Sequence, residues 1–202
     1  MLKTLNRLLD TECTQYIDLK AQIEVNQAQY DSDKTALEQA QEVFLDTYFT
    51  EINMLFRVIG SCDFNISRRI NRGGARTVYD LMVTFKGQLI NNSKLHCLFS
   101  ESDRRGLALC IFLAKIHRLS DEEKRKAILV MDDPVTSFDN ERISSILRIL
   151  FALKPSIKQM IITTHDKGMA SAVMKKFNEA QALKIIQTTQ GSSFSQTTKA
   201  GF

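Results

Sequence analysis

Two acidic residues, Asp132 and Asp133, end an apolar run of the kind that forms a buried strand. The run reads Ala127-Ile-Leu-Val-Met-Asp-Asp-Pro134. Strands of a parallel sheet present their carboxyl ends at one edge, and nucleotides bind at that edge in open α/β sheets. Carboxylates are hard oxygen ligands, and Mg²⁺ in nucleotide sites takes one or two of them together with phosphate oxygens. The run therefore predicts a site for magnesium and a nucleotide.

A second apolar run, Met160 to Thr163, leads to Thr164 and His165. A neutral imidazole can donate or accept a hydrogen bond, which suits contact with a phosphate or a water molecule. Taken singly, each motif is weak, because strands ending in acids are common and a histidine after a strand is more often structural. Their joint order along the chain is the stronger signal. The phosphate-binding pattern Gly-x-x-x-x-Gly-Lys-Ser/Thr occurs nowhere in the 202 residues.

The composition is that of an ordinary soluble globular protein, with 44% hydrophobic and 25% charged residues. A net charge of +4 is a mild basic surplus, which a normal solvated surface explains better than a polyanionic partner does. The four cysteines have no CxxC spacing, which argues against a zinc knuckle and a disulfide framework. No apolar stretch reaches the roughly 18 residues of a membrane span, and the N-terminus does not resemble a signal peptide. We therefore expect a cytoplasmic protein with no membrane partner.

The first 59 residues contain neither glycine nor proline and are predicted to form one long helix. One row of apolar residues recurs every seven positions, while polar residues such as Glu12, Asn26 and Asp33 interrupt the companion row. This pattern favours a coiled coil; an amphipathic helix packed on the globular part is the alternative. The apolar row of this predicted coiled coil is Leu2, Leu9, Tyr16, Ile23, Tyr30, Leu37 and Phe44. Gly60 marks the predicted boundary between an arm helix (1–59) and a globular part (60–202).

The globular part begins with two alternating segments, Phe64 to Ile70 and Val78 to Phe85, which predict a small β-hairpin around Asn71-Arg-Gly-Gly74. Further along, strands and helices alternate, which predicts an α/β fold with a parallel sheet flanked by helices. The strands expected in this sheet are Ala127 to Met131, Met160 to Thr163 and Leu183 to Thr188. Leu107 to Ile116 is expected to be a buried helix, 120–126 a charged linker, and 189–202 a frayed tail.

In this order the motifs resemble the C-terminal half of an ABC-type coiled-coil ATPase head. The similar proteins are the structural-maintenance-of-chromosomes (SMC), RecF and RecN group of P-loop NTPases, and the AAA family ATPases of the anticodon-nuclease and phage-defence type. The resemblance covers roughly residues 1–190 and is most specific at Asp-Asp-Pro-Val-Thr-Ser-Phe-Asp. It makes residues 60–202 the C-terminal lobe of such a head. It matches the signature motif to Ser100, Glu101, Ser102 and Asp103, Walker B to Ile128 through Asp133, the D-loop to Ser137-Phe-Asp139, and the switch to His165.

The resemblance also implies roles for these residues. Ser100 and the helix N-terminus behind it would face the γ-phosphate bound on the opposite subunit, since a helix N-terminus attracts anions. Asp132 would hold Mg²⁺, and Asp133 would orient or deprotonate the attacking water. His165 would hydrogen-bond the γ-phosphate or that water.

The chain departs from the family pattern at three points. Glu101 and Ser102 replace both signature glycines, and Asp133 replaces the usual catalytic glutamate with a shorter side chain. The Walker A lobe, which precedes the first coiled-coil arm in the family, is absent, so the chain is expected to start in the second arm.

Two hypotheses follow from the resemblance. In the first, the chain binds and hydrolyses ATP with Mg²⁺ as the signature, Walker B and switch half of a head, with a Walker A lobe from elsewhere or a second ATPase head as its partner. It would be inactive alone, would dimerise through heads, and would act on DNA, in DNA repair or in phage defence. In the second, it is a non-catalytic or truncated remnant that acts as a coiled-coil interaction module.

Overall fold

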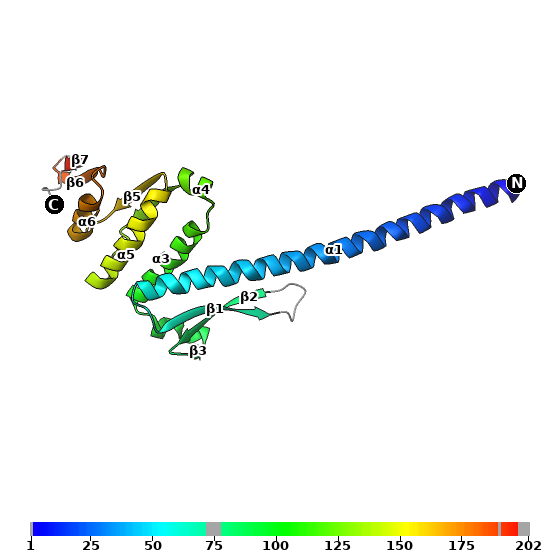
Figure 1. Ribbon diagram of the computed structural model, residues 1–202, viewed down its shortest axis with the longest axis horizontal. Helices are drawn as coiled ribbons and strands as arrows, with labels where there is room; N and C mark the ends of the chain where they lie inside the picture. Colours follow the sequence, from blue (N-terminus) through cyan, green and yellow to red (C-terminus); the bar gives the residue numbers. More distant parts are fainter. Residues whose placement is uncertain (1, 72–77, 190, 198–202) are drawn as a thin grey trace. The chain divides into compact units, whose positions relative to one another are not determined.

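Helices and strands follow one another as the sequence predicts for an α/β protein, after one long N-terminal helix (Figure 1). The computed structural model describes residues 2–71, 78–189 and 191–197. The chain divides into two units, Met1–Thr47 and Tyr48–Phe202. The division falls inside the long helix, ahead of Gly60.

Helix α1 spans Leu2–Val58. Gly60 terminates this helix, and its φ of 95° lies in the left-handed region that glycine adopts without strain. The amide of Gly60 donates to the carbonyl of Arg57 at 3.0 Å, and the amide of Ser61 donates to that of Phe56 at 3.0 Å. These two bonds form a Schellman motif, which satisfies carbonyls that the helix end would otherwise leave unpaired.

The predicted apolar row of α1 is exposed wherever its side chains are described; those of Leu2 and Leu9 lie outside that part. The last turns of α1 differ, because Ile52, Leu55 and Phe56 are buried in the core of the second unit. The helix thus exposes an apolar stripe along its length and packs at its end. The exposed fractions of the side chains in this row are 68% for Tyr16, 66% for Ile23, 62% for Tyr30, 59% for Leu37 and 50% for Phe44.

None of the described helices is long and apolar enough to cross a membrane.

Three antiparallel strands follow in the order β1 (Phe64–Asn71), β2 (Val78–Phe85) and β3 (Gln88–Ile90). The predicted hairpin is therefore confirmed, although 72–77, which hold most of its turn, lie outside the described residues. Strand β3 was not predicted. Lys86 and Gly87 turn the chain into it, with φ values of 50° and 78°. Such positive values at both central positions are typical of two-residue hairpin turns.

Helix α3 (Glu101–His117) is longer than the predicted apolar segment and less buried. Cys110, Leu113 and Ala114 are buried, whereas Ile111 and Phe112 are each 38% exposed. The expectation of a helix buried all round is therefore wrong. The helix is preceded by two short helical segments, η1 (Asn92–Lys94) and α2 (Leu95–Leu98).

The predicted linker is a short helix, α4 (Asp121–Lys126). Ser120 and Glu123 form a capping box at its start, in which the Ser120 hydroxyl accepts from the Glu123 amide and the Glu123 carboxylate accepts from the Ser120 amide. This pairing satisfies two amides that have no partner inside the helix. The linker prediction is wrong for this reason.

The parallel pair is confirmed as β4 (Ile128–Asp132) and β5 (Gln159–Thr163). Helix α5 (Asn140–Leu153) and the short helical segment η2 (Lys154–Ser156) connect the two strands, and α6 (Lys167–Lys176) follows β5. Side chains alternate along β4, where Leu129 and Met131 are buried and Ile128 and Val130 are exposed. One face of the parallel pair therefore packs on the core.

The third predicted strand of the parallel sheet pairs elsewhere. Strand β6 (Ala182–Thr188) forms an antiparallel pair with β7 (Gly191–Thr197), and within the described residues it does not join β4 or β5. Its assignment to the parallel sheet is wrong. The expectation of a frayed tail is wrong over 191–197, because those residues form the second strand of this hairpin.

Phe56 provides a test of the core, because its side chain is fully buried and packs near the rings of Phe64 and Phe99, with centroids at 6.0 and 6.5 Å. Phe56→Ala should lower the free energy of unfolding by about 3–5 kcal/mol, since it removes buried apolar surface and leaves a cavity. Denaturant unfolding measures this. Phe194→Ala is the control, because that ring is 73% exposed and its loss should change stability by about 0.5 kcal/mol or less. Similar losses for both variants would contradict this core.

Limited proteolysis provides a test of α1. Residues before Tyr48 should be cleaved first, because a helix whose apolar side chains are largely exposed opens locally at low free-energy cost. Mass spectrometry of the digestion products follows the order of cleavage. Equal resistance across 1–47 and 48–197 would show instead that the exposed stripe is covered in solution.

Candidate functional site

Asp132 lies at the carboxyl end of β4, directly opposite Thr163 of β5 in the parallel register. The hydroxyl of Thr163 donates a hydrogen bond to Oδ1 of Asp132. Both side chains are exposed. The alternation along the strands puts them on the same face as Val130 and Ile161, which form the register pair two residues earlier. Asp132 therefore presents its carboxylate on the open face of the parallel pair.

Asp133 and His165 meet at the same edge of the sheet. The backbone amide of Asp133 donates to the carbonyl of Thr163 at 2.8 Å, which fixes the residue at the end of the strand pair. Its Oδ2 lies 2.6 Å from Nδ1 of His165, and its Oδ1 accepts from the Thr164 hydroxyl at 3.3 Å. The hydroxyl of Thr136 also donates to Oδ2. A substrate contact by His165 would therefore use Nε2, the other ring nitrogen, and the ring is 75% exposed.

The pKa of the Asp133 carboxyl is held below its ordinary value of 3.8. The Thr136 hydrogen bond has the largest effect; burial acts in the opposite direction, and the hydrogen bonds from His165 and Thr164 and the charge of His165 lower the pKa further. A general base works best when its pKa is near the working pH. A carboxylate that is this weakly basic is better suited to orienting a water molecule than to removing its proton.

The residues at this edge fit a magnesium ion in one respect. Mg²⁺ keeps several waters and binds proteins through one or two carboxylates together with substrate phosphates. Asp132 offers an exposed carboxylate of this kind. Within the described residues, no group of three or more histidine, cysteine, aspartate or glutamate side chains is placed to hold a metal ion.

The predicted signature segment forms the N-terminus of α3. The Ser100 hydroxyl accepts from the Asp103 amide at 3.0 Å and lies 2.7 Å from Oδ2 of Asp103, which also accepts from the Ser100 amide at 3.3 Å. The side chain of Glu101 pairs with Arg105 at 2.7 Å on the helix surface. No hydrogen bond or ion pair among the described residues joins this segment to Asp132, Asp133 or His165. The predicted site residues thus form two separate groups.

The predicted D-loop leads from the Asp132 edge to α5. It follows Asp133, and both Asp133 and Ser137 have positive φ values, 47° and 69°. Non-glycine residues rarely adopt such values, and they concentrate at functional sites. Asp139 then caps α5 by accepting from the amide of Arg142 at 2.8 Å.

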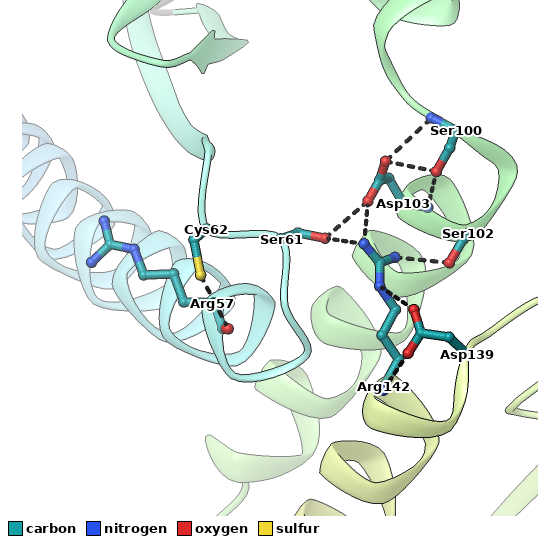
Figure 2. Close-up of polar contacts among 8 residues, drawn as sticks. All are labelled: Arg57, Ser61, Cys62, Ser100, Ser102, Asp103, Asp139 and Arg142. Carbon is teal, nitrogen blue, oxygen red and sulfur yellow. Dashed lines mark hydrogen bonds and ion pairs between the residues drawn. The ribbon is translucent and has the colours of Figure 1, made fainter.

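The signature segment, Ser100 to Asp103, forms one group with Arg142 and Ser61, which we call the signature group. The sequence did not predict Arg142 and Ser61 as site residues. The guanidinium of Arg142 donates through Nη2 to Oδ1 of Asp103 at 2.8 Å and through Nη1 to the Ser102 hydroxyl at 2.8 Å (Figure 2). Nη2 also donates to the Ser61 hydroxyl at 3.3 Å, and that hydroxyl donates to Oδ1 of Asp103 at 3.0 Å. A signal was available, since a cation in the first turn of a helix opposes the helix dipole and needs an acidic partner.

These contacts lower the pKa of the Asp103 carboxyl below 3.8. Burial is the largest single effect and raises the pKa, but the hydrogen bonds from Ser100, Arg142 and Ser61, together with the charge of Arg142, outweigh it. Asp103 therefore stays ionised, and its negative charge is paired inside the protein.

A family model described as AAA domain matches residues 3–199. No curated protein matches the chain. Among solved structures, the Smc head domain with a coiled coil and joint from Pyrococcus yayanosii is 12% identical, with a TM-score of 0.54 over 93% of this chain and 35% of that chain. The Smc head domain with an extended coiled coil from Pyrococcus furiosus, bound to the C-terminal domain of ScpA, is 13% identical, with a TM-score of 0.51 over 91% and 44%.

A third similar structure comes from work on ATP-driven dimerization and DNA-stimulated activation of SMC ATPases. It is 12% identical, with a TM-score of 0.51 over 79% of this chain and 91% of that chain. Identities this low show a common fold. The chain spans less than half the length of the two Pyrococcus chains.

Thr136→Val should raise the pKa of Asp133 toward 3.8, because it removes the hydrogen bond that lowers the pKa most. Thr164→Val is the matched control and should raise it less, since its hydroxyl is 3.3 Å away and has the smallest effect. Carbon-13 NMR titration of the Asp133 carboxyl measures both values. A group with a depressed folded pKa stabilises the protein above its unfolded pKa and loses that effect as the pH falls through the folded value. The Thr136→Val protein should therefore lose less stability below about pH 3.8. An unchanged pKa in Thr136→Val would contradict the arrangement.

Proposed function

Since the chain belongs to the AAA domain family and has the fold of an SMC-type ABC ATPase head fragment, we propose that it is the signature, Walker B and switch half of an ATP-hydrolysing head. In this proposal ATP is the substrate and Mg²⁺ the metal cofactor. A Walker A lobe, supplied by another polypeptide or by another part of a longer protein, completes the nucleotide site.

The observation that carries the proposal is the meeting of Asp132, Asp133 and His165 at one edge of the parallel strand pair. Asp132 would bind Mg²⁺, which would neutralise charge on the phosphates. Asp133 would orient the attacking water, in keeping with its lowered pKa. His165, held at Nδ1 by Asp133, would hydrogen-bond the γ-phosphate or that water through Nε2. Positioning and charge stabilisation of this kind account for most of the catalysis of phosphoryl transfer.

The uncovered face of the β4–β5 pair supports the need for a partner lobe. Parallel sheets are normally covered on both faces. Here Ile128, Val130 and Ile161 are 52%, 60% and 42% exposed. They share the face that carries Asp132 and Thr163. A lobe that covered these apolar side chains would bring its phosphate loop to the carboxylate of Asp132.

The signature group supports a second step, the joining of two heads. Ser100 lies at the N-terminus of a 17-residue helix, where amide groups and the helix dipole favour a phosphate. Within the described residues this segment has no bonded contact with the Asp132 edge, as expected if it acts on a nucleotide held by another head. We propose that two completed heads dimerise around ATP. A role on DNA, in DNA repair or in phage defence, is proposed from the family resemblance.

Reconstitution tests this function. The chain should be purified alone and with a Walker A lobe encoded in its genomic neighbourhood, and ATP turnover measured with and without Mg²⁺. Turnover is expected only in the mixture. Asp132→Ala should weaken binding of Mg²⁺-nucleotide, while Asp133→Asn should slow hydrolysis and leave binding nearly unchanged, because it removes the charge that orients the water.

A matched pair of variants tests whether the uncovered face of the β4–β5 pair binds the Walker A lobe. Val130→Asp should prevent association with the Walker A lobe, because it places a charge on the face to be covered. Val78→Asp makes the same change on β2 at a side chain of similar exposure, 51%, and should leave association intact. Magnesium-dependent turnover by the chain alone would refute the need for a partner lobe. If the Asp132 and Asp133 variants only impair folding, the chain is better described as a coiled-coil interaction module.

A further inference from the structure

Arg142 lies where three segments that are distant in sequence come together: the turn after α1, the N-terminus of α3 and the N-terminus of α5 (Figure 2). Its guanidinium contacts Ser61 in the first segment and Ser102 and Asp103 in the second, at the distances given above. In its own segment, its amide is bonded to Asp139 and its Nε lies 3.9 Å from the Asp139 carboxylate. One side chain therefore contacts all three segments.

The ion pair at the centre of this cluster is largely removed from water. The side chains of Arg142 and Asp103 are only 17% and 13% exposed. A charge withdrawn from water is costly unless it is paired and hydrogen-bonded, and losing one member leaves the other uncompensated. Arg142 uses the fixed fork geometry of its guanidinium to reach two acceptors of α3 at once, which a lysine ammonium cannot reproduce. The cluster is consequently specific in geometry as well as in charge.

The carboxylate of Asp103 connects Arg142 to Ser100 through hydrogen bonds. Its Oδ1 faces Arg142 and Ser61, while its Oδ2 bonds the amide and the hydroxyl of Ser100. Ser100 donates its hydroxyl proton to Oδ2 of Asp103 and caps the helix N-terminus that would face a phosphate in the proposed function. Its orientation depends on Asp103, and the orientation of Asp103 depends on Arg142.

We propose that Arg142 is a positioning residue that holds the signature segment in register with the D-loop and with the end of α1. The catalytic consequence rests on the proposed function, whereas the positioning itself is a property of this chain alone. Arg142 touches no reacting atom in this arrangement and acts through Asp103 and Ser100.

Amide hydrogen exchange on the whole chain tests the positioning. Arg142→Gln should accelerate exchange at the Ser61, Asp103 and Arg104 amides at least tenfold and leave the β4–β5 ladder unchanged. Arg142→Lys keeps the charge and loses the fork, so it should accelerate the same amides to a smaller extent. Arg148→Gln, on the same helix and bonded to Ser145 at 3.0 Å, is the control and should leave these amides unchanged. A uniform acceleration, one confined to α5, or none would overturn the proposal.

Asp103→Asn keeps the shape of the side chain and tests the same link if Arg142→Gln does not fold. It should loosen the Ser61 turn and the start of α3 together. Acceleration at the start of α3 alone would overturn the link to the end of α1.

Turnover by the reconstituted head tests the catalytic consequence. Arg142→Lys should lower kcat about tenfold with KM for ATP within about twofold, because the signature segment acts after ATP is bound in its own head. A wild-type kcat in Arg142→Lys would overturn the catalytic role. If the wild-type complex itself fails to hydrolyse ATP, the proposed function has failed, and the exchange experiment alone decides the positioning.

Discussion

The arrangement of the second unit depends on how closely α3 approaches the end of α1, and Gly106 makes that approach possible. A methyl group at Gly106 would lie 2.7 Å from Cδ1 of Ile59, 3.6 Å from Cε2 of Phe56 and 3.7 Å from Cε1 of Phe138. Phe56 belongs to the last turn of α1, Ile59 follows directly after this helix, and Phe138 belongs to the predicted D-loop. The same contact therefore sets how closely the end of α1, within the second unit, packs on α3 and where the loop that leads from Asp133 to α5 lies. Close packing at Gly106 fixes the distance between α3 and the end of α1, and the polar cluster around Arg142 fixes their relative orientation.

The two groups of candidate residues differ in physical character. Asp132 and His165 are exposed at the end of a strand pair, and threonine hydroxyls hold the carboxylates of Asp132 and Asp133 there. The signature group is fixed by a largely buried ion pair and by a capping box. Exposed side chains at a strand edge can contact a ligand directly. A buried ion pair instead holds the side chains bonded to it in fixed positions. In the function that we propose, the first group would carry the chemistry and the second would orient the helix terminus offered to a second head.

Local patterns predicted those parts of the fold that depend on neighbouring residues. Apolar runs ending in polar residues predicted β4 and β5, and Gly60 predicted the end of the long helix. Pairing partners were harder, because β6 has an apolar pattern that fits a parallel or an antiparallel neighbour equally well. The contact between Arg142 and Asp103 joins residues 39 positions apart, and no local pattern specifies it. The capping box of Ser120 and Glu123 is a local pattern that predicts the start of α4. The linker prediction rested on the charge of residues 120–126 alone and did not take this pattern into account.

Strands β4 and β5 are hydrogen-bonded to each other and, within the described residues, to no other strand, so each leaves a row of backbone groups open along its outer side. Such edges act as templates on which another polypeptide can add a strand. Molecules in which these edges of β4 and β5 stay uncovered are therefore prone to add to one another strand by strand, so the open pair is a site of self-association as well as of docking.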